Sequence, residues 1–538
     1  MQSDYILLAI TGIAGALLLL VIELIPGVRL WRKSLSAVLL TLMTLLWAIL
    51  PRTAQWPLSI WSPSTVSGGI LLWDLNPALW GLGLVLALAL SGAAWIEAVD
   101  ARAALPLSGS ITLLALLTAW HVLAGGSLLT TLALWSVFDV LWGVAGLLSG
   151  NDGERMTFAL FAHGIASLCL WAAYLLLSRE GGGTLWWSLW PSAPVTLLLA
   201  AAAVLRIGLY PFQVVYPRRL RAMGPMTLVA LVGPVLGLAL LYRLMLLPAN
   251  TVLPASIAVM GFISLLWGGA RALLWKGKGS LLWANYGFLG GITTAVALTG
   301  AHSLLLPALG TWFLGFALLL AMRRRDRRAI FWSWPAWIAV LLFLGLPPSP
   351  MGNLFRAALS ATTWSARVLL VVGWAFVAGA LLRWARQPWE ERVTTPQEML
   401  TVTPVRTWQQ AGLVGGLALP LGGLLWLTAQ APGAAFSWSG FLLWGLMLVL
   451  ALGLCWIIEA GKASGSALHA KGRVSEWLRA SAGVLEVLDL QWFYRALLRG
   501  MSHLLSFVRV LFEVVEGSSA LLWSLLVLLI LFLVVINR

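Results

Sequence analysis

The chain has 538 residues, of which 61% are hydrophobic and only 10% are charged, and this balance excludes an ordinary soluble protein. Its net charge of +15 does not indicate nucleic-acid binding, because the basic residues fall mostly between apolar segments. The two cysteines, Cys169 and Cys455, give neither a disulfide framework nor metal-ligand spacing. We therefore expect an all-α polytopic membrane protein with no metal and no cofactor of its own.

Apolar runs recur along the whole chain, each long enough to cross a bilayer as a helix. The first run, YILLAITGIAGALLLLVIELI, is too long for a signal peptide and has no basic residue before it, so we expect it to persist as a span. About sixteen spans are predicted, at residues 5–25, 34–50, 77–97, 106–124, 127–148, 156–178, 190–210, 225–246, 253–274, 281–300, 303–322, 329–362 (interrupted), 365–383, 411–430, 436–459 and 518–536.

Alternate loops between these spans differ sharply in Lys and Arg. One set holds Arg29, Arg32, Lys33, Arg102, Arg155, Arg218, Arg219, Arg221, Arg271, Lys276, Lys278, the run 323–328 (RRRDRR), Arg383, Arg386, Arg392, Arg406, Lys462, Lys471 and Arg473. The other set holds little beyond Arg52 and Arg179. Because basic loops stay in the cytoplasm, we expect a multi-pass protein of a bacterial-type inner membrane with its N-terminus outside.

Residues 484–516 have a different pattern, in which polar residues recur every three or four positions among Leu, Val, Phe and Trp. Such a stripe is typical of an amphipathic helix lying along the membrane surface. The predicted organisation is a transmembrane domain at 1–460, an amphipathic cytoplasmic-face helix within 461–516 and a terminal span at 517–538. This helix either braces a neighbouring protein or lies on the membrane without a partner.

Two predicted spans are interrupted by proline, and each interruption has an arginine close by. The interruptions are RIGLYPFQVVYP (206–217), with Pro211, and FLGLPPSPMGNLFRAAL (343–359), with Pro347 and Pro348. Discontinuous helices mark ion or substrate sites in many transporters, and their spacing here suggests two structural repeats. Arg206 and Arg356 either face protein or water inside the membrane, or extend to the headgroups from a helix end.

Five motifs in order resemble the antiporter-like membrane subunits of respiratory complex I, with relatives in membrane-bound hydrogenases, multisubunit cation/proton antiporters and inorganic-carbon uptake complexes. They are LLWDLNPALW (71–80), LAGGSLLTTLALWSVFDVLW (123–142), RIGLYPFQVVYP with MGPMTLVALVGPVLGLALLYRL (206–217 and 223–244), KGSLLWANYGFLGG (278–291) and FLGLPPSPMGNLFRAAL (343–359). The resemblance implies a subunit of a multi-protein complex, with an amphipathic helix and terminal span like the lateral element of the distal subunit.

The chain departs from this family at the residues that the resemblance implies for proton transfer. The family pairs a glutamate of the fifth span with a lysine of the seventh. Here the matching positions are Ser136, with Asp139 three residues on, and Arg206, while the lysine of the second interruption becomes Arg356. Other titratable positions of the family fall near Val229, Val235, Pro307 and Thr311.

Lysine exchanges protons when its surroundings move its pKa toward neutrality, whereas arginine keeps its proton. We therefore expect Arg206 and Arg356 to be fixed charges, so that the proton path is altered or lost, and one helical turn lets Asp139 pair with Arg206. A water-filled half-channel lined by Asp139, His163, His121 or Tyr210 is the alternative, with Lys278 in the charge network. Each histidine is otherwise a packed helix residue.

Three functions follow from these patterns. The first is a membrane subunit of a complex I-like ion-translocating assembly, with other membrane subunits and lipid as partners and no nucleic acid. In that case any redox chemistry, whether of a quinone oxidoreductase or a hydrogenase, belongs to the partners. The second is a stand-alone secondary transporter that holds an anionic solute with Arg206 and Arg356. The third, an enzyme acting on lipid-linked substrates, lacks the carboxylate pair or metal ligands that it needs.

Overall fold

The computed structural model describes two compact units of the chain, Met1–Arg479 and Ala480–Arg538. The described residues are 2–25, 31–57, 71–98, 105–148, 153–180, 184–216, 224–247, 252–275, 278–321, 330–346, 349–386, 406–430, 438–463, 483, 485, 487–490, 492–497, 499–500, 502–503 and 506. The predicted terminal span, Pro347, Pro348 and the side chain of Lys278 lie outside them. The predicted domain boundaries stay a prediction.

The first unit is a helical bundle with one short hairpin, and the all-α membrane class expected from composition is confirmed. Its helices are α1 (Gln2–Leu24), α2 (Arg32–Ile49), α3 (Pro77–Ala98), α4 (Ser108–Ala124), α5 (Leu128–Leu148), α6 (Gly153–Arg179), α7 (Ala193–Ile207), α8 (Pro225–Met245), α9 (Val252–Leu274), α10 (Lys278–Thr299), α11 (His302–Ala321), α12 (Ile330–Phe343), α13 (Pro350–Ala361), α14 (Trp364–Arg386), α16 (Arg406–Gln430) and α17 (Trp438–Ala463). Strands β1 (Ala54–Pro57) and β2 (Leu72–Leu75) pair antiparallel.

Ten helices of the described chain are long and apolar enough to cross a membrane, and four shorter apolar helices accompany them. The predicted number of sixteen spans therefore stays a prediction. In the second unit, residues 492–497 are helical and follow a turn at 488–489, after which Leu490 has a φ of 53°. The continuous amphipathic helix expected at 484–516 is described only in these pieces.

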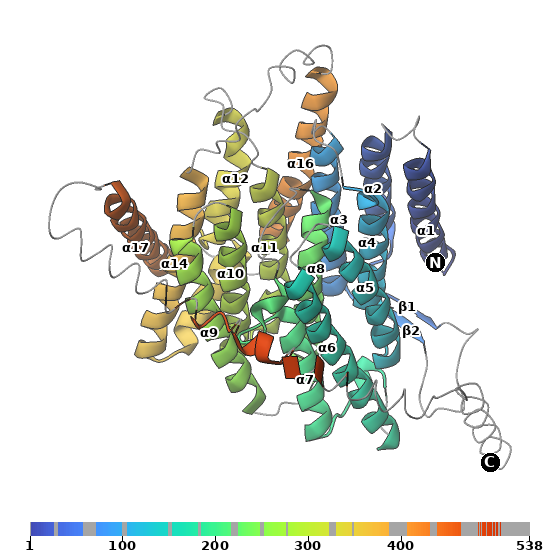
Figure 1. Cartoon of the computed structure of the whole chain (residues 1–538), viewed down its shortest axis with the longest axis horizontal. Coiled ribbons are helices and arrows are strands. Elements are labelled where there is room, and N and C mark those ends of the chain that lie inside the picture. The colour runs from blue at the N-terminus through green and yellow to red at the C-terminus, as the bar shows by residue number, and fades with distance from the viewer. Residues whose placement is uncertain are drawn as a thin grey trace. The chain divides into compact units, whose positions relative to one another are not determined.

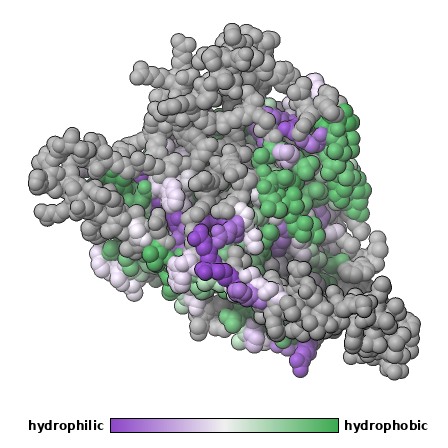
Figure 2. Space-filling model, viewed as in Figure 1, coloured by the Kyte–Doolittle hydropathy of each residue, from purple (hydrophilic) through white to green (hydrophobic). Residues whose placement is uncertain are grey.

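The helices of the first unit run side by side, with α3, α8 and α11 inside the bundle and α1 at its edge (Figure 1). The inner helices bury most of their residues, whereas α1 and α2 bury 33% of theirs. Figure 2 shows a continuous hydrophobic surface over α1 and α2. In a multi-pass membrane protein such a surface suits contact with lipid or with an apolar face of another protein, because lipid chains are as apolar as leucine.

Helix α7 ends just after Arg206, where Gly208 adopts a φ of +72° and its N–H donates to the Val204 carbonyl at 3.0 Å. This left-handed cap satisfies a carbonyl of the last turn. The Tyr216 hydroxyl donates to the Ile207 carbonyl at 2.7 Å, and the Tyr210 N–H donates to Ser264 Oγ of α9 at 2.8 Å. The chain can therefore leave the helix inside the bundle with its backbone groups paired.

Pro211 lies in the segment after this cap, which continues as a 3-10 turn at Gln213–Val215. At the second predicted interruption, α12 ends at Phe343 and α13 begins at Pro350. Whether either pair of segments is one discontinuous span stays a prediction.

Replacing Gly208 with alanine is expected to destabilise the protein by about 1–2 kcal/mol, because an L-residue resists the left-handed conformation. The added Cβ would also lie 2.8 Å from Tyr216 Cε2. The apparent melting temperature of the detergent-solubilised protein measures the effect. Gly164→Ala is the matched control: nothing lies within 4 Å of its added Cβ, and helix propensity favours alanine. Equal melting temperatures for the two variants would contradict the cap.

Candidate functional site: a buried charge cluster between α5, α6 and α7

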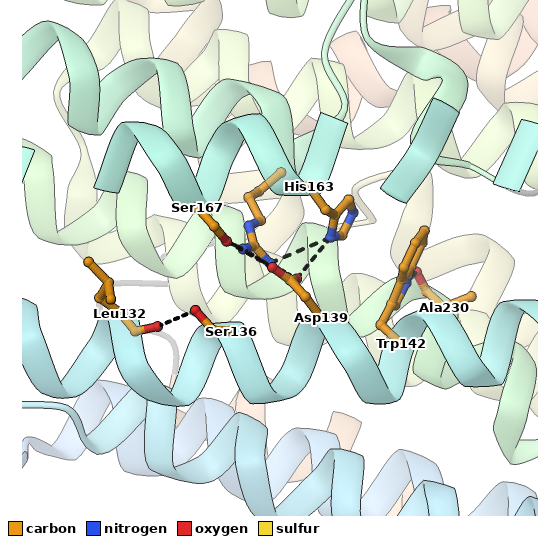
Figure 3. Close-up of polar contacts among 8 residues, drawn as sticks. Leu132, Ser136, Asp139, Trp142, His163, Ser167 and Ala230 are labelled. Carbon is orange, nitrogen blue, oxygen red and sulfur yellow. Dashed lines mark hydrogen bonds and ion pairs between the residues drawn. The ribbon is translucent and has the colours of Figure 1, made fainter. Parts of the chain in front are cut away.

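Three helices bring four polar side chains together inside the bundle: Asp139 from α5, His163 and Ser167 from α6, and Arg206 from α7. Arg206 donates through both terminal nitrogens to Asp139, Nη1 to Oδ1 and Nη2 to Oδ2. Ser167 Oγ donates to Asp139 Oδ2 at 2.9 Å and accepts from Arg206 Nη2 at 2.8 Å. His163 Nδ1 lies 3.1 Å from Asp139 Oδ1 (Figure 3). This network is the bidentate pairing of which arginine, but not lysine, is capable.

The cluster is enclosed by protein, because Arg206 is 0% exposed and His163 is 1% exposed. Two positions were predicted for Arg206: facing protein or water, or extending to the headgroups from a helix end. Its complete burial fits the protein-facing position and not the extended one. The indole of Trp135, one turn before Asp139 on α5, lies 4.4 Å from Arg206 Cζ and adds a cation–π contact. A buried ion pair needs such additional partners to offset its desolvation, although Arg206 Nε has no hydrogen-bond partner in the described part of the chain.

Helix α8 packs against α7 at the level of Arg206. A Cβ on Gly237 would lie 2.8 Å from the Ile207 backbone nitrogen and 2.9 Å from Arg206 Cβ. Only glycine therefore allows the two helices to approach this closely, and the guanidinium is directed toward α5 and α6.

His163 is held in one orientation by two contacts. The Trp142 indole stacks on its ring, with centroids 4.2 Å apart and planes 15° apart. Because a carboxylate only accepts, Nδ1 carries the hydrogen in the contact with Asp139. Within the described part of the chain, Nε2 is buried and has no hydrogen-bond partner. The second ring nitrogen of His163 is thus available for a further hydrogen bond.

Trp142 also pairs a backbone carbonyl of α8 that has no partner within its own helix. Pro234 lies inside that helix and has no N–H, so the Ala230 carbonyl four residues earlier loses its helical partner. Trp142 Nε1–H donates to this carbonyl at 3.1 Å (Figure 3). The position of Trp142, and hence of His163, is therefore tied to the proline of a neighbouring helix.

Replacing Trp142 with phenylalanine should keep the ring stack but leave the Ala230 carbonyl unpaired. We expect a loss of about 1–3 kcal/mol in unfolding free energy, seen as a lower melting temperature. Pro234→Ala restores a backbone N–H for the same carbonyl, so the double variant should recover most of this loss. An equal loss from Trp142→Phe with and without Pro234 would show that the hydrogen bond is unimportant.

The other residues expected in an ion path contact different groups. His121 in α4 has Nδ1 2.6 Å from the Leu117 carbonyl, and its ring lies against Tyr5 and Trp73. The Tyr210 ring lies 6.0 Å from that of Trp267. The structure thus brings His163, but neither His121 nor Tyr210, into hydrogen-bond contact with Asp139 and Arg206.

The residues at or near which the sequence resemblance places the family's titratable groups do not themselves titrate. Ser136 donates to the Leu132 carbonyl of its own helix and stays outside the cluster (Figure 3). Val229 and Val235 are fully buried in α8, and Thr311 Oγ1 donates to the Pro307 carbonyl within α11. Within the described residues, no three His, Cys, Asp or Glu side chains lie close enough together to hold a metal ion.

Arg356 differs from Arg206 in its surroundings. It lies on α13, is half-buried, and donates from Nη2 to Asn353 Oδ1 at 3.2 Å, three residues earlier on the same helix. Among the described residues it forms no ion pair, whereas Arg206 is paired within the chain. The two arginines therefore share a sequence context but not an environment.

Sequence reasoning missed Ser167, Trp135 and Trp142 as members of the cluster. Ser167 follows His163 by four residues, and Trp135 and Trp142 flank Asp139 by four and three, so helical spacing was the available signal. It also missed Arg243, one of several further buried arginines, which donates to the Leu123 carbonyl at 2.6 Å and to Thr131 Oγ1. Arg243 ties the end of α8 to α4 and α5.

No protein-family model and no curated protein matches the sequence. Solved structures do share the fold. A chain of the Mrp complex from Dietzia sp. DQ12-45-1b is similar over 94% of this chain, with 15% identity and a TM-score of 0.69. A chain of the membrane-bound sulfane sulfur reductase, an archaeal respiratory membrane complex, is similar over 98% of this chain, with 14% identity and a TM-score of 0.69. A chain of respiratory complex I from Thermus thermophilus with bound NADH (18%, TM-score 0.63) matches 84%.

These matches cover 99% of the sulfane sulfur reductase and complex I chains, but only 62% of the Mrp chain. The protein thus has the fold of antiporter-like subunits of multisubunit membrane complexes. The kinship predicted from the sequence motifs is confirmed at the level of the fold.

Proposed function

We propose that the protein is a membrane subunit of a multi-protein ion-translocating assembly, in which the proton path through this chain is altered or lost. The fold supports the first part. The observation that carries the second is the buried Arg206–Asp139 pair, because a guanidinium keeps its proton and fixes its carboxylate partner as an anion. Neither member of such a pair passes a proton onward, so the chain acts as a scaffold or conducts protons by another route.

The alternative, a stand-alone transporter that holds an anionic solute with Arg206 and Arg356, is less well supported. Arg206 already has its anion in Asp139 and is completely buried, so a solute would have to displace an internal partner. We further propose that the protein lies in a bacterial-type inner membrane with its N-terminus outside and its basic loops in the cytoplasm. Labelling of single cysteines placed beside Arg52 and within 323–328 from either side would test that orientation.

Gentle purification of the native protein separates the two functions. A subunit should co-purify with other membrane proteins in fixed ratio, measured by quantitative mass spectrometry and by mass photometry. A lone monomer or homodimer that moves an anionic solute in liposomes would overturn the proposal.

A further inference from the structure

The buried nitrogen Nε2 of His163 has no hydrogen-bond partner in the described part of the chain, although the ring itself is firmly held. The other ring nitrogen, Nδ1, contacts Asp139 at 3.1 Å, and the Trp142 indole stacks on the ring. A buried polar atom without a partner is unfavourable, and in folded proteins such atoms are commonly paired with an ordered water. Nε2 therefore indicates a site for a small polar ligand.

Nε2 lies beside Gly233 of α8, where the packing leaves room for a small atom. A Cβ on Gly233 would have His163 Cε1 at 3.3 Å, Trp142 Nε1 at 3.7 Å and His163 Nε2 at 3.9 Å as its nearest neighbours. One turn further along α8, a Cβ on Gly237 would lie 2.8 Å from the Ile207 nitrogen. The contact with α7 thus requires glycine at 237. At 233 the contacts are longer, and the space of the absent side chain adjoins Nε2.

A second polar group, the Ala230 carbonyl, borders the same space (Figure 3). The proline inside α8 removes its helical partner, and Trp142 Nε1 donates to it at 3.1 Å. A carbonyl oxygen has two lone pairs, so it can accept a second hydrogen bond. In helices a side-chain oxygen can reach the carbonyl three residues earlier, as Thr118 Oγ1 reaches the Ala115 carbonyl at 3.1 Å. By the same spacing, an oxygen beside Gly233 reaches the Ala230 carbonyl.

We propose that a water molecule binds beside Gly233 and bridges His163 Nε2 to the Ala230 carbonyl. Water fits both groups, because it can donate to each of them and can instead accept from Nε2 when that nitrogen carries a hydrogen. Ordered waters pair backbone groups that proline frees in membrane helices. A metal cation fits less well, because hard cations take several oxygen ligands and this space offers one carbonyl oxygen.

The water site goes beyond the proposed function, because it adds α8 to the helices that hydrogen bonds connect to the cluster. Neither Asp139 nor Arg206 has to move or release a proton for the water to bind. A proton route that avoids the locked pair can therefore use it. The site is expected whether or not the chain conducts protons, so its test is separate from that of the proposed function.

Radiolytic footprinting of the full chain, with any subunits that accompany it, tests the site. X-ray pulses split water into hydroxyl radicals, which oxidise the side chains that contact water, including water bound inside a protein. Mass spectrometry then gives the oxidation rate of each residue. We expect His163 and Trp142 to be oxidised several-fold faster than Trp120, which is also buried but donates to the Gly83 carbonyl at 2.8 Å.

Gly233→Ala places a methyl group where the water is proposed, so the oxidation of His163 and Trp142 should fall to the rate of Trp120. Gly164→Ala, at an exposed glycine of α6, is the matched control and should leave these rates unchanged, since nothing lies within 4 Å of its added Cβ. Melting curves show whether the variants fold. If Gly233→Ala does not, Gly233→Ser carries the same expectation, because its hydroxyl takes the place of the water.

Two results would overturn the inference. One is oxidation of His163 and Trp142 no faster than that of Trp120 in the wild type. The other is oxidation that persists in a folded variant of Gly233. A density map that resolves ordered water inside the bundle gives a direct check: density between Nε2 and the Ala230 oxygen supports the site, and well-resolved waters elsewhere without one here contradict it.

Discussion

Removing the charge of Arg206 alone is expected to lower the unfolding free energy by about 3–5 kcal/mol, because it leaves the Asp139 carboxylate buried without its counter-ion. In Arg206→Met the side chain keeps an unbranched apolar stem of similar length to that of arginine, so much of the loss reflects the missing charge. Ser167 and His163 can still donate to the carboxylate, but neither carries a permanent positive charge. The apparent melting temperature of the detergent-solubilised protein should fall accordingly, and expression should fall with it.

The double variant Asp139→Asn with Arg206→Met shows whether the lost stability comes from the unpaired buried carboxylate or from the loss of the arginine side chain itself. It contains no buried charge, so it should recover much of the stability that the single variant loses. Arg367→Gln, at an exposed arginine that donates to backbone carbonyls, is the control and should change the melting temperature little. A double variant no more stable than Arg206→Met would mean that the buried pair is not the source of the effect.

Proton flux is expected to be the same in the wild type as in the double variant Asp139→Asn with Arg206→Gln, because a locked ion pair releases no proton. The measurement uses the purified protein, with any subunits that accompany it, in liposomes that contain a pH-sensitive dye and face a pH step. Arg206→Lys should change the proton flux, since an ammonium can lose its proton where a guanidinium cannot. We expect this variant to exceed the wild type in flux several-fold.

The Arg206→Lys variant also carries a structural control. A lysine cannot make the bidentate contact with Asp139 and reach Ser167 at the same time, so some stability should be lost. Flux must therefore be compared at a temperature where both proteins are folded. Wild-type flux that disappears in the neutral double variant would falsify the locked-pair mechanism, since it would place the pair on the conducting path.

The pairing of Asp139 with Arg206 was within reach of the sequence, although 67 positions separate the two residues. The resemblance supplied the two helices, and one helical turn from Ser136 placed Asp139 on the right face. The rest of the cluster was not within reach. Whether Ser167 faces Asp139, and whether Trp142 faces His163, depends on how α5 and α6 are rotated about their axes, and rotation is set by packing of the whole bundle.

The same limit explains why the residues expected to line one half-channel are found in separate places. His121 and Tyr210 are polar residues in apolar surroundings, as His163 is, and nothing local distinguishes them. The fold directs His121 toward Tyr5 and Trp73, and Tyr210 toward Trp267. It likewise separates Arg206, buried and paired, from Arg356, which lies on the outer face of α13.

Membrane class and helical content were readable from residue order, because hydrophobicity over some twenty consecutive positions is a local property that lipid enforces directly. So was the chemical nature of the two arginines, since no environment in a protein makes a guanidinium a useful proton carrier. Which of the two arginines forms an ion pair within the chain could not be predicted in this way. It depends on contacts between distant segments, and those exist only after glycines such as Gly237 have let the helices approach and Pro234 has directed Trp142 to its carbonyl.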